Sequence, residues 1–494
     1  MMIGNQRNAT PQRPDLFEAA RRVSLAMLDV LHGLHDSGHR FEMHQSYPIV
    51  DPEAPGDSPF TWVKTASGPP NYGSVFSLDT SWTAKVAYRD LDGFDQFLAL
   101  VHADDQVTRF LGGPRLDDEM GQRFVVFGAA QLPENMAERH LHQHGWNAPD
   151  TNDLVDVYCE LEHFWLHHGA LASELLVPIL GVSFDDDLID LPNGWRIERM
   201  STETQRARWP VTTQALQHAA ALRAATHTLV IPGMTVGCEF SFPGFVNPLD
   251  GQYPIEQIDE FFQALAAATS GHSGYGHFVF RPHGWANGYI ADLPVLLPGP
   301  VIPRYPKRLE HVTEQPQSQL TSQDTKYLRA HVSGSSDAKL PSRVRLAARR
   351  LVTATRRDDT DDSVVDLCVA LEALVGDRGP GETTYKVAMR TAALLADEWK
   401  PDFTRMVVTR AYSYRSDVVH GRAPSKYAAT DLDGTPQSTL ELVEFVARQL
   451  LSRFLQDLSL TAEVADERMI QSLRDAPLPP AAAADETADA HPDL

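Results

Sequence analysis

Apolar residues recur every three or four positions through most of segment 325–460, and this spacing predicts helices. The apolar stripes run through 342–355, 364–375, 383–396, 403–418 and 438–458. Short polar segments separate these stripes, and short loops favour antiparallel packing of neighbouring helices. We therefore expect an all-α antiparallel helical bundle at 325–460.

The first 320 residues mix two periodicities. Runs rich in β-branched and aromatic residues predict strands at 61–65, 82–88, 124–127, 228–236 and 277–281. Helical spacing predicts helices at 154–167 and 255–268, and a shorter helix at 171–177 that Pro178 would end. The chain as a whole is therefore expected to be α+β, with a mixed α/β region of one or two domains at 1–320.

Charge is distributed unevenly along the chain. The formal net charge is −23, because 43 Lys and Arg stand against 66 Asp and Glu. Such an acidic chain is disfavoured as a non-specific binder of duplex nucleic acid. Segment 341–357 is the opposite, with six arginines and no acid. Segment 461–494 holds eight acids, two arginines and many Ala and Pro, which predicts a disordered tail.

Cysteine spacing and apolar content limit the class of protein. Cys159, Cys238 and Cys368 stand far apart, so neither a disulfide framework nor a zinc motif is indicated. No apolar run approaches the roughly eighteen residues of a membrane span, and the N-terminus lacks a signal core. The loop at 376–381 fits neither a Walker loop nor a dinucleotide fingerprint. We expect a cytoplasmic protein with no membrane partner, no cofactor and no metal.

One segment of the helical region carries candidate chemistry. The sequence Y-S-Y-R-S-D-V-V-H-G at 412–421 holds Arg415 and His420 with four residues between them. Two segments precede it, A-L-E-A-L-V at 370–375 and E-T-T-Y-K-V-A-M-R at 382–390. In this order, the three segments resemble the Apea-like branch of the HEPN superfamily, whose helical domains carry an arginine followed at short distance by a histidine.

The resemblance implies an activity and an assembly. It implies a metal-independent endoribonuclease with Arg415 and His420 as catalytic residues, usually dimeric and often a toxin-like effector in antiviral defence or abortive infection. The chemistry suits these residue types. Histidine transfers protons near neutral pH, and the fixed fork of arginine matches phosphate oxygens. One such histidine per chain supplies one proton-transfer group, so we expect a homodimer or a higher even-numbered oligomer acting on RNA.

Further residues are predicted to assist. Those with a supporting role are Glu372, Tyr412 and Ser416; Ser416 stands where many HEPN proteins have Asn, Asp or His. Those predicted to contact RNA are Arg343, Arg345, Arg349, Arg350, Lys386 and Arg390. Simpler explanations stay open. A basic residue and a histidine are common at a helix end, which would explain Arg415 and His420. Glu372 would be solvated or ion-paired, and Lys386 and Arg390 would form a solvated basic face. The arginines of 343–357 would pair with the acids at 358–362.

Helix geometry adds a condition. Five positions correspond to a rotation of about 140°, so Arg415 and His420 share a face only if His420 leaves the helix. Gly421 favours a helix end at this point.

Two other functions stay open. A catalytically inactive HEPN domain would serve as a scaffold for dimerisation or nucleotide binding. A metal-dependent hydrolase would use N-terminal histidines, and the candidate ligands are His140, His142, His144, Glu160, His163 and His167. Their spacing matches no zinc motif. Under the main hypothesis, region 1–320 senses a trigger or restrains the helical domain.

Overall fold

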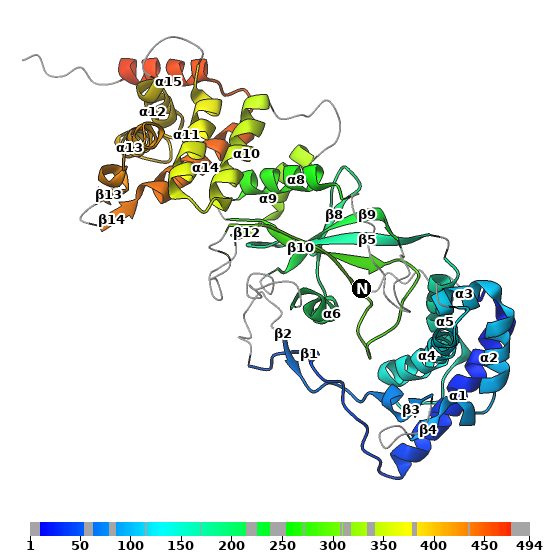
Figure 1. The fold of residues 1–494 in the computed structure, drawn as a ribbon. Helices are drawn as coiled ribbons and strands as arrows, with labels where there is room; N and C mark the ends of the chain where they lie inside the picture. The colour runs from blue at the N-terminus through cyan, green and yellow to red at the C-terminus, as the bar shows by residue number, and fades with distance from the viewer. Residues whose placement is uncertain are drawn as a thin grey trace, which may run out of the picture. The chain divides into compact units, whose positions relative to one another are not determined.

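The computed structural model divides the chain into two compact units. The residues it describes are 10–53, 63–78, 85–113, 116–167, 169–213, 225–237, 253–269, 272–306, 309, 318–332, 341–377, 383–432 and 435–475. The first unit comprises Met1–Leu265 and Gly271–Ala338, and the second comprises Ala266–Ser270 and Lys339–Leu494. Helices and sheets both occur (Figure 1), which confirms the α+β class. Within the described ranges, no helix is both long and apolar enough to cross a membrane.

The N-terminal part of the first unit is mainly helical. It contains α1 (Pro14–Asp36), α2 (Phe94–Ala103), α3 (Asp105–Gly112), α4 (Glu119–His144) and α5 (Thr151–Trp165). Helix α4 packs against α1, α3 and α5, and the helix predicted at 154–167 is confirmed as α5. The strand predicted at 124–127 is wrong, because these residues lie inside α4. Val125 and Ala129 are buried one helical turn apart, and this burial overrides the local strand preference.

Short elements lie between the first helices. They are η1 (Tyr72–Val75), η2 (Tyr88–Asp90), the antiparallel pair β1 (Tyr47–Val50) and β2 (Val63–Ala66), and the parallel pair β3 (Phe76–Ser77) and β4 (Val86–Ala87). Strands β2 and β4 correspond to the strands predicted at 61–65 and 82–88. Residues 61, 62 and 82–84 lie outside the described residues.

A six-stranded antiparallel sheet follows, with strand order β11-β10-β5-β9-β8-β7. Figure 1 labels its strands β5, β8, β9 and β10. Its strands are β5 (Ala170–Pro178), β7 (Leu188–Asp190), β8 (Arg196–Arg199), β9 (His227–Gly237), β10 (Tyr275–Pro282) and β11 (Leu297–Arg304). Strands β9 and β10 confirm the predictions at 228–236 and 277–281. The helix predicted at 171–177 is wrong, because β5 pairs with β9 and β10 on its two sides. A strand buried on both faces has a continuous apolar run, which periodicity alone does not distinguish from a helix.

The remaining elements of this part are α6 (Thr202–Thr213), α8 (Ile255–Ala268), α9 (Ser322–Val332) and the parallel pair β6 (Val182–Phe184) and β12 (Ser318–Leu320). The helix predicted at 255–268 is confirmed as α8. Helix α9 belongs to the first unit, and the boundary between the units lies at residues 338 and 339. The structural boundary therefore differs from the predicted start of the helical region at 325.

The second unit is built mainly of helices. They are α10 (Ser342–Arg356), α11 (Thr360–Val375), α12 (Thr383–Leu394), α13 (Pro401–Val419), α14 (Thr439–Gln456) and α15 (Ala462–Asp475). Helix α11 packs against α10, α13 and α14, and α12 packs against α13 and α15. Leu371, Val407 and Phe454, from three of these helices, share one buried core. The five helices predicted from apolar stripes are therefore present as α10 to α14.

Two features of this unit differ from the prediction. A hairpin of β13 (Ala429–Leu432) and β14 (Thr435–Ser438) lies between α13 and α14, beside the short helix η6 (Ser425–Tyr427). The disorder predicted from residue 461 is wrong for Ala462–Asp475, which forms α15. Ala465 of this helix is buried in the core, and Asp466 binds Arg390 of α12. Residues 476–494 lie outside the described residues.

Candidate functional site

An ion pair between α11 and α13 holds the predicted catalytic arginine. Arg415 Nη1 donates a hydrogen bond to Glu372 Oε1 at 2.7 Å, and the guanidinium carbon lies 5.7 Å from the centroid of the Tyr412 ring. The Arg415 and Glu372 side chains are 32% and 28% exposed, and Arg415 Nε has no hydrogen-bond partner among the described residues. One carboxylate thus anchors Arg415 while other donors of its fork stay unused.

His420 lies directly after the end of α13. It has φ −91° and ψ 9°, and the next residue, Gly421, has φ +68°. This left-handed conformation suits glycine, and the Gly421 N–H donates to the Val418 carbonyl at 2.9 Å, which closes the helix end. His420 therefore leaves the helical path, as the predicted offset from Arg415 requires.

The His420 imidazole faces solvent. The residue is exposed, and its ring has no hydrogen-bond or ion-pair partner in the part of the chain that the structure describes. No direct bond joins it to Arg415 within that part. Ser416 is also exposed, and its carbonyl accepts the His420 backbone N–H at 3.1 Å. The structure therefore brings Glu372, Tyr412 and Arg415 into contact. His420, five residues after Arg415 in the sequence, makes no side-chain bond to them. We call Glu372, Arg415 and His420 the α13 site.

Tyr412 supports this site from inside the protein. Its side chain is buried, and its hydroxyl donates to the Cys368 carbonyl at 3.5 Å. Burial raises the pKa of Tyr412 above its ordinary value, and the neighbouring Cys368 and Glu372 act in the same direction. The phenol therefore stays protonated, which gives Tyr412 a packing role beneath Arg415 in place of a role in proton transfer.

Both predicted RNA-binding residues of α12, Lys386 and Arg390, have partners within the protein. Arg390 is 6% exposed and bonds to Asp466, Asp377 and the Val375 carbonyl at 2.7 to 2.9 Å. The hydrogen bond to Asp466 raises the pKa of Arg390 above its ordinary value. Lys386 lies 3.4 Å from Asp377. This arrangement gives Arg390 a structural role, the joining of α12 to α15, in place of the predicted RNA contact.

The arginines of α10 divide into two groups. Arg350 bonds to Asp366 at 2.7 Å, and Arg343 donates to the Leu460 carbonyl at 2.7 Å. Arg345 and Arg349 are exposed, four residues apart on the same helix face, and have no partner among the described residues. Asp366 lies outside the acids at 358–362, whereas Arg357, directly after α10, binds Asp362 at 3.0 Å. The predicted pairing with the acids at 358–362 is therefore seen for Arg357, while Arg350 uses Asp366.

The N-terminal histidines form two groups on α4. In the first, His44 Nε2 and His142 Nε2 lie 3.5 and 3.6 Å from Glu138 Oε1. Burial would raise the pKa of Glu138, but the contacts with His142 and His44 outweigh it and lower this pKa to about 2. We call these three residues the α4 cluster.

The second group on α4 consists of His140, His144 and Asp153, with nitrogen–oxygen distances of 3.8 Å. The other predicted ligands do not gather. The His163 ring contacts the Gly284 carbonyl, and the His167 ring contacts the Phe164 carbonyl.

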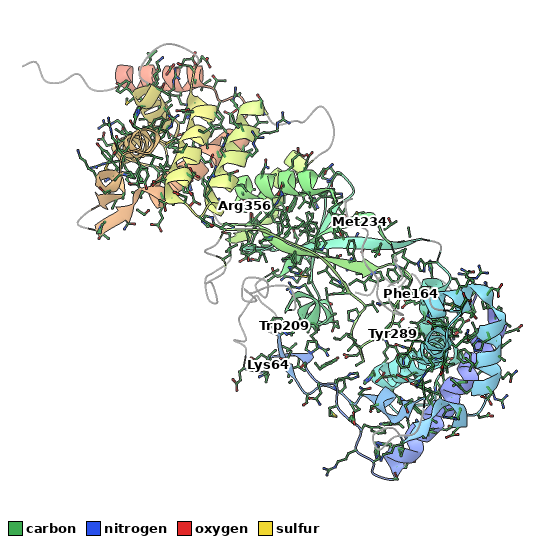
Figure 2. All side chains as sticks on the ribbon, viewed as in Figure 1. Lys64, Phe164, Trp209, Met234, Tyr289 and Arg356 are labelled. Carbon is green, nitrogen blue, oxygen red and sulfur yellow. The ribbon has the colours of Figure 1, made fainter. Side chains whose placement is uncertain are left out.

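The first unit also contains a cavity of about 510 Å³. Phe164 and Tyr289, both labelled in Figure 2, belong to its largely apolar wall. No Asp, Glu, His, Lys or Arg of the described residues lines it. The polar side chains of its described wall are therefore uncharged and include Gln131, Asn135 and Tyr289.

Comparison of the chain with protein-family models, with curated proteins and with solved structures found no match. Function is therefore inferred from the residues of the sites themselves. Sequence reasoning missed the contribution of His44 to the α4 cluster, because His44 lies far from α4 in the chain. The spacing of Glu138 and His142, four residues apart on one helix, is the signal that was available.

Proposed function

We propose that the second unit is a HEPN-type endoribonuclease that cleaves RNA without a metal ion, in the cytoplasm, as a toxin-like effector. In this proposal α10 to α14 form the antiparallel bundle of the family that segments 370–375, 382–390 and 412–421 resemble. The observation that carries it is the α13 site: an arginine that is anchored through one carboxylate and whose side chain stays 32% exposed, and an exposed histidine directly after the same helix.

The proposed reaction uses the substrate's own nucleophile. The 2′-hydroxyl loses a proton and attacks the adjacent phosphorus, and the bond from phosphorus to the 5′-oxygen breaks as that oxygen gains a proton. The products are a 2′,3′-cyclic phosphate and a 5′-hydroxyl. His420 transfers a proton, and Arg415 donates hydrogen bonds to the phosphate oxygens, whose negative charge grows in the transition state.

An even-numbered assembly completes this chemistry. One chain supplies one such histidine, whereas the reaction needs a base and an acid. Val419, next to His420, is an apolar side chain that is 64% exposed and suits a contact with a second copy. The exposed pair Arg345 and Arg349 is the remaining candidate for guiding RNA phosphates.

The test uses the full-length chain. Cleavage-site mapping on total RNA first identifies a target, and an oligonucleotide of that sequence is then cut in excess EDTA, beside a version with a 2′-deoxy nucleotide at the cleavage position. We expect cleavage in EDTA, the cyclic-phosphate product, an intact deoxy substrate and, by light scattering, twice the mass of one chain. Loss of cutting in EDTA, or equal cutting of the deoxy substrate, would contradict the mechanism. RNA or nucleotide binding without any cleavage would favour the inactive scaffold.

A further inference from the structure

The α4 cluster places three metal-binding side chains around one point. Glu138 and His142 lie one turn apart on the same face of α4, and His44 comes from the segment before β1. Both histidine Nε2 atoms face the same carboxylate oxygen, and the three ligand atoms lie within 4.8 Å of one another. Two imidazoles and one carboxylate form a donor set that suits divalent transition metals.

The two imidazoles have no ordinary hydrogen-bond partner. His44 Nε2 and His142 Nε2 are both buried and unpartnered among the described residues, and the His142 side chain is only 5% exposed. Their distances to Glu138, 3.5 and 3.6 Å, exceed the usual N–H···O range of roughly 2.7–3.2 Å. Buried polar atoms nearly always make a hydrogen bond of ordinary length, so two buried nitrogens that face one shared carboxylate oxygen from beyond that range need an explanation.

A bound ion supplies that explanation. With metal–ligand bonds of about 2.0–2.1 Å, tetrahedral coordination places neighbouring ligand atoms roughly 3.3–3.4 Å apart. The two measured nitrogen–oxygen distances are close to this separation. Both distances are too long for good hydrogen bonds, but they are close to the ligand–ligand separation along an edge of a coordination tetrahedron.

Surrounding backbone holds the ligands in place. The Tyr72 N–H donates to Glu138 Oε1 at 3.0 Å. The His44 N–H donates to the Pro69 carbonyl at 3.0 Å, and the Gly68 N–H donates to the His44 carbonyl at 2.8 Å. Hydrogen bonds of this kind orient metal ligands before the ion arrives. The His44 segment is therefore fixed against residues 68–69, and His44 reaches α4 from a defined position.

We propose that His44, Glu138 and His142 bind one divalent transition-metal ion, with Zn²⁺ as the best match, and leave one coordination position open. Three protein ligands with an open fourth position are the arrangement of zinc sites that bind water or a substrate. The Glu138 and His44 side chains are 16% and 19% exposed, so small molecules can approach. The site belongs to the first unit and does not depend on RNA cleavage by the second.

The neighbouring histidine group provides a matched control. His140 Nε2 contacts the Asn147 carbonyl at 2.8 Å, and Asp153 accepts the Asp150 N–H as part of the cap of α5. His144 is 41% exposed, and its ring lies 3.8 Å from Asp153. His140 Nδ1 is also buried without a hydrogen-bond partner. However, this group is the weaker ligand set, because both of its nitrogen–oxygen distances are 3.8 Å, the two nitrogens face different oxygens of Asp153, and His144 is exposed. His144→Ala therefore removes a histidine from the same helix without touching the proposed site.

The experiment titrates the full-length protein, stripped with EDTA and then dialysed, with Zn²⁺ in competition with a chromophoric chelator. We expect one tight equivalent in the wild type and in His144→Ala. In His142→Ala and in the near-isosteric Glu138→Gln, the affinity should fall by more than the roughly 10- to 100-fold that loss of an outer hydrogen-bond partner costs. Circular dichroism identifies any variant that fails to fold, and Glu138→Gln keeps the test decisive if His142→Ala is such a variant.

A second metal ion reports the coordination geometry of the proposed site. Co²⁺ added in place of Zn²⁺ should give the intense visible absorption of a low-coordinate site in the wild type and in His144→Ala, and not in Glu138→Gln. The proposal is overturned if the wild type binds no tight equivalent of Zn²⁺, or if His142→Ala and His144→Ala weaken binding equally. Either result leaves the ribonuclease proposal unaffected, because cleavage products report on the second unit alone.

Discussion

The α4 cluster and the α13 site both combine histidine with a carboxylate, yet they leave different groups available. In the α4 cluster, the carboxylate faces two buried ring nitrogens across 3.5 and 3.6 Å. In the α13 site, the carboxylate is bound to an arginine at 2.7 Å, and the histidine stands in solvent after the helix end. The first arrangement provides converging lone pairs, whereas the second provides an exposed proton-transfer group beside a cation.

The contrast shows that partners and exposure, more than residue type, decide what chemistry is left. Arg390 makes the same point within the second unit. It has two carboxylate partners and a carbonyl and is 6% exposed, whereas Arg415 has one carboxylate partner and is 32% exposed. A side chain whose bonds are all used holds the fold together. A side chain with unused donors at the surface is available to a ligand.

The largest effect is expected from the α13 site. Replacing His420 by Ala removes the proton-transfer group, so RNA cleavage should fall by roughly 10²- to 10⁴-fold. Arg415→Ala should lower it by a similar factor through lost stabilisation of the phosphorane. Stability should change by less than about 1 kcal/mol in both variants, because the ion pair of Arg415 is partly exposed and His420 is an exposed side chain after the helix end. Initial cleavage rates and thermal unfolding of the same preparations give both quantities.

Two controls match these variants in residue type. Arg405 lies on α13 and makes an exposed contact of 3.6 Å with Asp402, and His102 is an exposed histidine of α2. Arg405→Ala and His102→Ala should keep wild-type cleavage rates. A folded His420→Ala protein with full activity would remove the catalytic assignment and erase the contrast with the α4 cluster.

A smaller effect, on the free energy of unfolding, is expected when Arg390 is replaced. Arg390→Met removes the guanidinium that Asp377 and Asp466 share, and Asp377 keeps the longer 3.4 Å contact with Lys386. We expect a loss of about 3 kcal/mol, the lower end of the range for breaking a buried ion pair, because both carboxylates are partly exposed. Hydrogen exchange should show lost protection in α15, which Arg390 joins to α12. The exposed control Arg405→Met should cost less than about 1 kcal/mol. Unchanged exchange in α15 would show that apolar packing alone holds this helix.

Sequence reasoning succeeded where burial follows one local period. The apolar spacing of 364–375 and 403–418 gave α11 and α13, and Val364, Leu371 and Val407 from these stripes are buried in the core. It failed at 124–127 and 171–177, where runs of apolar residues fit a helix or a strand and tertiary packing decides between them. It also missed α15, which depends on a contact with Arg390 that the composition of the tail does not reveal.

In the candidate sites, too, local features could be predicted from the sequence and contacts between distant residues could not. The arginine–histidine spacing and the helix end at Gly421 were readable because they are local. The pairing of Arg415 with Glu372 was anticipated only as a supporting role, since 43 residues separate them. The approach of His44 to α4 was not predictable from one sequence, because it depends on the backbone pairing of residues 44 and 68–69.

The smallest effect concerns Glu134, one turn before Glu138 on α4. Burial raises the pKa of Glu134 to about 8, and the charge of Glu138 acts in the same direction. The Tyr88 hydroxyl donates to Glu134, but no cation among the described residues pairs with it. The two carboxyl groups of one helix face thus have opposite shifts, because Glu138 contacts two histidines and Glu134 contacts none.

The pH dependence follows from this difference. In the unfolded chain, Glu134 ionises near its ordinary pKa of 4.5, whereas the folded protein keeps the proton up to about pH 8. The stability that the protonated Glu134 contributes to the folded protein is therefore fully present below pH 4.5 and is lost as the pH rises through 8. The neutral Glu134→Gln lacks this loss, so relative to the wild type it should gain on the order of 2 kcal/mol between pH 5 and pH 9. One pKa unit corresponds to about 1.4 kcal/mol, and relaxation around the buried group absorbs part of the shift.

Thermal unfolding at both pH values, in EDTA to keep the α4 cluster free of metal, measures this gain. Glu119→Gln, an exposed carboxylate in the first turn of the same helix, serves as the control and should show the same small difference at both pH values. An equal effect of Glu134→Gln at pH 5 and pH 9 would mean that Glu134 is ionised in the folded protein. Its environment would then resemble that of Glu138, and the distinction drawn between the two carboxylates of α4 would fail.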